Sequence, residues 1–501
     1  MRAGIGRAKP EGSPKGEVRM AGPLAMAVSM VLLAALTGCA VGPNYERPAV
    51  ETPSTFRPAA SDTRDLSATN SLAELGWWEL TEDETLRRYI AEALNNSWDI
   101  KAAAARVLQA EAVLRVTRSQ FFPSVAAGGD VLSVRTSEVG PAGIPPGVDP
   151  QKGYGDVYVA MSAYEVDLWG RIRRASEAAR ARLLATEAAQ ESVRQTLVTD
   201  VASTYLLLLQ LDQDLEIGRR TLANRKDSLA LTTAREDGGV ASMQDVVQAR
   251  ILVATAEASI TDTLRQIEQT ENAFSLLLGR NPGPVERGRP LAEQPVRAEV
   301  PAGLPSVLLE RRPDLRAAEQ QLVASNADIG QAKAAFFPQL TLTGLYGVQS
   351  LSLSELFTGP AQAWQFGPTL TLPLFTGGRL SGNLELARAQ FEEAVALYQK
   401  SVQDAFRDVS DSLIANQRLR ELRARIAERA EANRMATELA NIRYEGGVTT
   451  YLEVLYNEQE LFNAELTLSR AEVNELLSVI QLYRALGGGW QNDNTTMVQK
   501  P

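Results

Sequence analysis

A long internal repeat restricts what this chain can fold into more than any other feature of its sequence. The segment 118–123, Arg-Ser-Gln-Phe-Phe-Pro, returns at 333–338 as Lys-Ala-Ala-Phe-Phe-Pro, an offset of 215 residues. Further along, Asp-Gly-Gly-Val at 237–240 returns as Glu-Gly-Gly-Val at 445–448, an offset of 208 residues. Matches that keep their spacing over such distances indicate a tandem duplication. Each half must therefore fold into the same order of elements.

Both halves read as helices, then a strand pair, then two long helices. The runs 171–236 and 379–444 are rich in Ala, Glu, Arg and Leu and contain no Pro, so each predicts a helix of about 100 Å. A Gly-Gly-Val turn ends each run, because glycine readily takes the positive φ that a helix reversal needs. We assign helices to 81–121 and 306–337, strand hairpins to 122–168 and 338–375, and long helical hairpins to 171–279 and 379–487.

Alternating apolar and polar residues identify the strands. Trp364, Phe366, Leu370 and Leu372 alternate with polar or small residues, over the length of about ten residues that is typical of a membrane-barrel strand. Four strands cannot close a barrel, because the smallest bacterial barrels have eight, and an open sheet edge is forbidden in lipid. Three copies would supply 12 strands, and their long helices would form a 12-helix tube. An ordinary half-buried sheet is the alternative reading of the strands alone.

The single cysteine, Cys39, follows a basic segment and a short apolar run. The run 24–36 is too short for a membrane-spanning helix, which needs about 20 residues, but it suits a secretory signal. Leu-Thr-Gly-Cys at 36–39 resembles the bacterial lipobox, which implies that residues 1–38 are cleaved and that Cys39 receives a diacylglycerol and an N-acyl chain. Ala40 stands where an Asp would favour the inner membrane, so the resemblance implies the outer membrane. A chance cysteine near an ordinary cleavage site is the alternative.

The composition excludes several classes of function. The chain has no histidine and one cysteine, which removes histidine-dependent catalysis, disulfides and His- or Cys-ligated metal centres. Its net charge of −10 argues against a nucleic-acid partner, because phosphate contacts need clustered Lys and Arg. We therefore expect neither an enzyme nor a metal or other bound cofactor.

Several motifs together resemble one family, the TolC superfamily of outer-membrane efflux channels, and within it the lipidated OprM/NodT-type branch. They are Cys39 with Val-Gly-Pro-Asn-Tyr at 41–45, Leu-Glu-Arg-Arg-Pro-Asp-Leu-Arg at 309–316, both Phe-Phe-Pro segments, 443–448 with 451–455, and Ala-Leu-Gly-Gly-Gly-Trp at 485–490. The resemblance covers essentially the chain after residue 38.

The resemblance implies a mainly α fold with a membrane β-barrel, built from a tandem-duplicated protomer. It implies a homotrimer with a 12-strand barrel in the outer membrane and a 12-helix tube in the periplasm. It also implies docking through a periplasmic adaptor to an inner-membrane pump of the RND type. The segments 39–80, 281–305 and 488–501 would form the family's equatorial region, although from its residues alone 281–305 is only a proline-rich linker.

The resemblance further implies an iris-like gate where the inner hairpins meet at the periplasmic end. Glu453 matches an acid that rings the narrowest point, and Asp245 is its repeat partner. Tyr456 stands where the family member TolC has a second acid, and Thr449 replaces a basic partner. Tyr444 matches a tyrosine that helps to lock the closed state. The simpler reading is that both acids are solvated and are favoured by the positive end of the helix dipole.

The two turns have an implied partner as well. Gly238, Gly239 and Val240, with their repeat partners Gly446, Gly447 and Val448, would contact the helical tips of the adaptor, although the glycines alone indicate only a turn. An acid repeated on a threefold axis concentrates negative potential, so we expect the channel to prefer cations. By contrast, Arg311, Arg312 and Asp314 favour a structural role at the start of a helix.

Two other functions remain compatible with the sequence. The same architecture serves as an exit duct for secreted polypeptides, although the lipobox and the terminal Gly-Gly-Gly-Trp favour small-molecule efflux. A structural periplasmic coiled-coil lipoprotein would share the lipobox and the helical hairpins, but it should lack the four alternating strands.

Overall fold

The computed structural model describes residues 40–53, 56, 72–141, 144–145, 147–294 and 307–490. The signal segment, Cys39, the last part of the linker between the halves and the C-terminal tail lie outside these residues. The chain divides into two compact units, one holding the strands and the other holding nearly all of the helices. Within the described residues, no helix is both long and apolar enough to cross a lipid bilayer.

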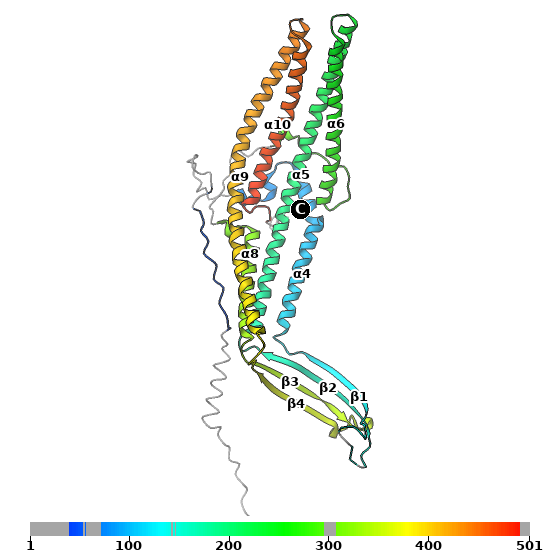
Figure 1. Ribbon diagram of the computed structural model, residues 1–501, viewed down its shortest axis with the longest axis vertical. Helices are drawn as coiled ribbons and strands as arrows, with labels where there is room; N and C mark the ends of the chain where they lie inside the picture. The colour runs from blue at the N-terminus through cyan, green and yellow to red at the C-terminus, as the bar shows by residue number, and fades with distance from the viewer. Residues whose placement is uncertain are drawn as a thin grey trace, which may run out of the picture. The chain divides into compact units, whose positions relative to one another are not determined.

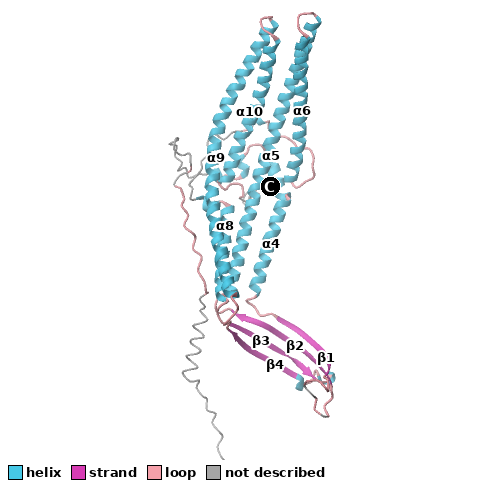
Figure 2. Cartoon of the chain, in the orientation of Figure 1, coloured by secondary structure: helices cyan, strands magenta, loops and turns pink. Residues whose placement is uncertain are grey.

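The strand unit is one antiparallel sheet in the order β1-β2-β3-β4, drawn in magenta in Figure 2. Its strands are β1 (Val125–Arg135), β2 (Gln151–Val166), β3 (Gln339–Ser350) and β4 (Gln362–Thr371). The central pair joins the two halves of the repeat, and its register shifts between Met161 and Tyr164. The outer strands β1 and β4 each have one partner within the described chain. One edge of each outer strand is therefore unpaired.

Two long helical hairpins form the main part of the helical unit, as Figure 1 shows. They are built from α5 (Arg171–Asp237) with α6 (Met243–Leu277), and from α9 (Arg379–Glu445) with α10 (Tyr451–Ala485). These ends lie within two residues of the expected ones, because the helices stop where glycine permits the reversal.

The shorter helices are interrupted. The structure has η1 (Leu72–Glu74), α2 (Trp77–Leu80), α3 (Glu84–Asn96) and α4 (Trp98–Ser119) in the first half, and η2 (Leu291–Glu293), α7 (Leu308–Arg311) and α8 (Pro313–Ala334) around the second. The short turns η4 (Leu353–Glu355) and η5 (Gly359–Ala361) lie between β3 and β4. Pro313 opens α8, a position that proline favours because its missing N–H has no helical partner there.

The linker between the halves packs on the core of the helical unit. The rings of Tyr89 and Phe274 lie 5.1 Å apart and almost perpendicular, beside the buried Tyr205. The Tyr205 hydroxyl donates a hydrogen bond to Asp83 at 3.1 Å and accepts one from the backbone N–H of Gly288 at 2.7 Å. The described part of the linker is thus tied to α3 and α5 by buried polar contacts.

Candidate functional site

The turns of the two hairpins have the same backbone geometry. Gly239 and Gly447 take φ values of +72° and +71°, a region that side chains with a Cβ rarely adopt. The N–H groups of Val240 and Val448 each donate to a carbonyl of the preceding helix at 2.9 Å. Both valine side chains point away from the protein and are 71% and 72% exposed. Each tip therefore presents one exposed valine on a hydrogen-bonded turn.

Glu453, the expected gate acid, lies in the first turn of α10 and is 36% exposed. It accepts a hydrogen bond from the Thr449 hydroxyl and forms an ion pair with Arg443 Nη1 at 3.0 Å. The family pattern has a base where this chain has Thr449. Here Arg443, near the end of α9, is the basic partner of Glu453 instead. Sequence reasoning gave Arg443 no role, although a base ten residues before an acid across a tight turn was a usable signal.

Asp245, the repeat partner of Glu453, has a different local role. Its carboxylate accepts hydrogen bonds from the N–H and the hydroxyl of Ser242, at 3.0 Å and 2.8 Å. Its own N–H donates to the Ser242 hydroxyl at 3.2 Å. This reciprocal capping box starts α6. Among the described residues, Asp245 and Glu453 form no hydrogen bond with each other.

The two expected gate tyrosines lie in different surroundings. The Tyr444 ring is buried, 5.3 Å from the ring of Tyr451 and under the guanidinium of Arg235 at 4.5 Å. Because Arg235 belongs to α5, Tyr444 joins the two hairpins near their tips. Burial raises the pKa of Tyr451 to about 12. Tyr456, in contrast, is 66% exposed on α10.

The segment that follows Cys39 is fixed to the helical unit, although Cys39 itself lies outside the described residues. Arg47 makes a two-pronged ion pair with Glu319 on α8, at 2.6 Å and 2.7 Å. The Tyr45 hydroxyl donates to the same carboxylate at 3.2 Å, and Asn326 Nδ2 donates to the Pro43 carbonyl at 3.1 Å. These contacts fix residues 43–47 along α8.

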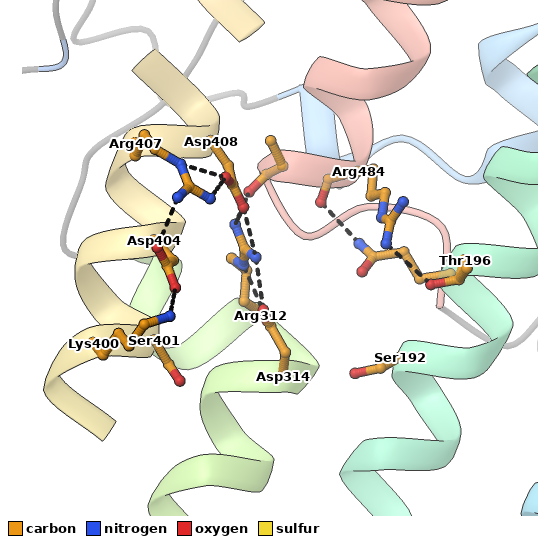
Figure 3. Close-up of polar contacts among 12 residues, drawn as sticks. Ser192, Thr196, Arg312, Asp314, Lys400, Ser401, Asp404, Arg407, Asp408 and Arg484 are labelled. Carbon is orange, nitrogen blue, oxygen red and sulfur yellow. Dashed lines mark hydrogen bonds and ion pairs between the residues drawn. The ribbon is translucent and has the colours of Figure 1, made fainter. Parts of the chain in front are cut away.

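Arg312 connects three helices of the same unit, as Figure 3 shows. Its side chain is 12% exposed and pairs with Asp314 at 2.6 Å and with Asp408 on α9 at 3.4 Å. Its Nη1 also donates to the carbonyl of Ala485 at the end of α10, at 3.3 Å. The expected structural role at the start of a helix therefore holds for Arg312, but its contacts reach much further than α8.

The described residues contain no group of three or more His, Cys, Asp or Glu side chains placed to hold a metal ion.

Comparison with known proteins identifies the family. The model of the outer membrane efflux protein family matches residues 89–280 and 304–488. The toluene efflux pump outer membrane protein TtgF of Pseudomonas putida is 39% identical over 486 residues, covering 93% of this chain and 97% of that protein. The outer membrane protein OprJ of Pseudomonas aeruginosa is 36% identical over 480 residues, covering 95% and 98%.

A solved structure agrees with these matches. The open state of the MtrE outer membrane channel of Neisseria gonorrhoeae superposes with a TM-score of 0.81 at 31% identity, covering 91% of this chain and all of that one. The agreement extends over both halves of the repeat.

Proposed function

The chain belongs to the family of outer membrane efflux proteins, and from this premise we propose how this member is assembled and gated. It is the outer-membrane exit channel of a tripartite efflux pump and not an enzyme. In our proposal it conducts drugs or other small molecules passively, from an RND-type inner-membrane transporter and its periplasmic adaptor to the outside. The hairpins form an iris-like gate at the periplasmic end.

The observation that carries the assembly is the sheet with two unpaired edges. Each copy offers β1 and β4 with one free row of N–H and C=O groups, and such edges are unfavourable in lipid. Pairing β4 of one copy with β1 of the next removes every edge once the ring closes. We propose that three copies share a 12-strand barrel, as the family resemblance implies.

The repeat also indicates which helices meet between copies. Within one copy Tyr451 and Leu455 on α10 are buried in a cluster that includes Leu229 of α5 and Ala249 and Leu252 of α6. Their repeat partners on α6, Met243 and Val247, are 58% and 46% exposed. A neighbouring copy would cover this face with α9, the repeat partner of α5. The exposed face of α6 thus supports a head-to-tail ring.

The turn residues Gly238, Gly239 and Val240, with Gly446, Gly447 and Val448, are the proposed contacts for the adaptor. Two rigid tips per copy, each with an exposed valine, would give six such points in a trimer. Apolar side chains on rigid turns suit the tip-to-tip contact that this proposal requires.

We expect Glu453→Gln to reduce the preference of the channel for cations. Three copies would place three Glu453 carboxylates near one axis, and Arg443 neutralises them only in part because both groups are solvent-exposed. Reversal potentials of purified protein in planar bilayers under a salt gradient measure the effect. Conductance in the same bilayers tests the channel itself.

The matched control is Asp245→Asn at the repeat partner. Asp245 is engaged in the α6 cap, so its loss should weaken that helix start but leave the selectivity unchanged. An unchanged reversal potential in Glu453→Gln, or a wild-type channel that prefers anions, would contradict the proposed acidic ring.

We propose that Cys39 carries the lipid and that the ion pair between Arg47 and Glu319 fixes the chain that follows it. Cys39→Ala should abolish incorporation of radiolabelled palmitate, because the cysteine sulfur is the attachment point. The assembled channel should persist, since closure of the sheet does not need the lipid. Labelling that survives the substitution would show that the anchor lies elsewhere.

The two alternatives fare differently. The structural coiled-coil lipoprotein is set aside, because the chain has the four strands that such a protein should lack. A duct for polypeptides remains a second candidate on architecture alone. The names of several curated relatives refer to efflux pumps, among them three toluene efflux pumps, which favours small molecules.

A further inference from the structure

One arginine in the helical unit is buried where most others are exposed. Arg225 on α5 is 1% exposed. Its Nη1 donates to the carbonyl of Leu252 on α6 at 2.9 Å, and its Nη2 donates to Gln459 Oε1 on α10 at 3.1 Å. Its guanidinium also lies 5.1 Å from the centre of the Phe462 ring, within range of a cation–π contact. This one side chain therefore contacts both hairpins.

A polar cavity of about 310 Å³ adjoins this contact, lined by α5, α9 and α10. Ser228 donates to Glu458 Oε1 at 3.2 Å across it. Arg225 Nε and Glu458 Oε2 are buried and have no hydrogen-bond partner among the described residues. Burial raises the pKa of Glu458 and lowers that of Arg225. A polar space of this size is large enough for water that can bridge such groups.

An ion pair between the hairpins near Arg225 is far more exposed. Arg220 on α5 pairs with Glu465 on α10 at 2.7 Å, but the Arg220 side chain is 53% exposed. Exposed ion pairs contribute little to stability because water and salt screen them. Hydrogen bonds from a buried charge contribute more, and losing one partner leaves the other unsatisfied. The Arg225 contact is thus a buried, charged link between the two hairpins.

The repeat shows that this link is not a general property of hairpin pairs. At the offset of 208 residues, Asn433 replaces Arg225, and Ile251 replaces Gln459. The corresponding contact between neighbouring copies would therefore lack both the guanidinium and its acceptor. The contact within a copy has this hydrogen-bonded link.

We propose that Arg225 is a positioning residue that holds the two hairpins of each copy together above their tips and so keeps the gate closed. This inference rests on the proposed gated channel. When the hairpins separate, the bond from Arg225 to Gln459 has to break. The cavity beside it supplies water to solvate both groups once they are apart.

The test compares Arg225→Met with wild-type protein in planar bilayers. Methionine keeps an apolar contact with Phe462 but removes the charge and both hydrogen bonds. We expect the open fraction at low voltage to rise about tenfold, the change that loss of a charged hydrogen bond corresponds to. Arg220→Met, the same substitution one turn away at an exposed pair, should stay within about twofold of wild type.

Gln459→Leu removes only the acceptor and serves as the second variant if Arg225→Met does not assemble. It should raise the open fraction as well. The double variant should open as often as Arg225→Met alone, because Gln459→Leu removes a hydrogen bond that Arg225→Met has already broken. Stable Arg225→Met and Gln459→Leu trimers that open no more often than wild type would overturn the proposal. So would an effect of Arg225→Met that Gln459→Leu does not share.

Hydrogen exchange separates this proposal from the channel function. In Arg225→Met, amide exchange in 451–462 should accelerate, and in Arg220→Met it should not. Acceleration in a protein that never conducts would support the link and count against the gated channel. Unchanged exchange in a conducting protein would overturn the link and leave the channel in place.

Discussion

Treated with a short thiol cross-linker, the double variant Arg250→Cys/Ala436→Cys is expected to migrate as a covalent trimer on a denaturing gel. The expectation comes from moving one observed contact by one repeat. Ser228 on α5 touches Glu458 on α10 within a copy, and the residues 208 positions away are Ala436 on α9 and Arg250 on α6. Arg250 is exposed and Ala436 is half-buried, so both thiols should be reachable between copies.

Single variants are the controls for this experiment. Arg250→Cys alone and Ala436→Cys alone should remain monomeric on the gel, since neither can link a ring head to tail. Dimers without trimers would indicate a two-copy contact and contradict the closed ring. Monomers despite full reaction of both thiols would contradict the proposed pairing of α6 with α9.

Arg312→Ala is expected to lower the thermal stability of the assembled protein more than any exposed arginine substitution. Arg312 is largely buried. It pairs with Asp314 and Asp408 and donates a hydrogen bond to the Ala485 carbonyl. Removing it takes a buried donor from all three acceptors at once and costs about 3 kcal/mol. Heating in mild detergent, followed by the loss of trimers on a gel, measures the change.

The neighbouring Arg407 provides the control. It pairs with Asp404 and Asp408 on the same helix, but its side chain is 61% exposed. Arg407→Ala should therefore cause a much smaller loss. Equal losses in the two variants would show that burial of Arg312 does not determine the stability of this joint.

Much of the architecture could be predicted from the sequence, because it depends on local rules. Pro-free helical runs, glycine at the reversals and alternation in the strands placed the hairpins α5–α6 and α9–α10 within two residues. The repeat then required each half to have the same elements. These signals are local in the chain, and each needs only a few neighbouring residues to be read.

The candidate site was predicted less completely. The motif proposed Glu453 and Tyr444 as gate residues, which stays a prediction, but it did not indicate their partners Arg443 and Arg235. The sequence could not distinguish Asp245 as a capping residue from Asp245 as a gate acid, because both roles place an acid in the first turn of a helix. The structure shows the cap with Ser242, and the role of Asp245 at the gate stays a prediction.

By itself, then, the sequence determined the duplication, the long hairpins, the strands and the position of the single cysteine. Only the tertiary structure decided which arginine of an arginine-rich helix is buried, as Arg225 is, and which acid 272 residues away holds Arg47. The physical reason is that helical periodicity identifies the buried face of a helix but not the residues that pack against that face. That choice depends on long-range packing, in which the same residue type is solvated at one position and fully desolvated one turn away.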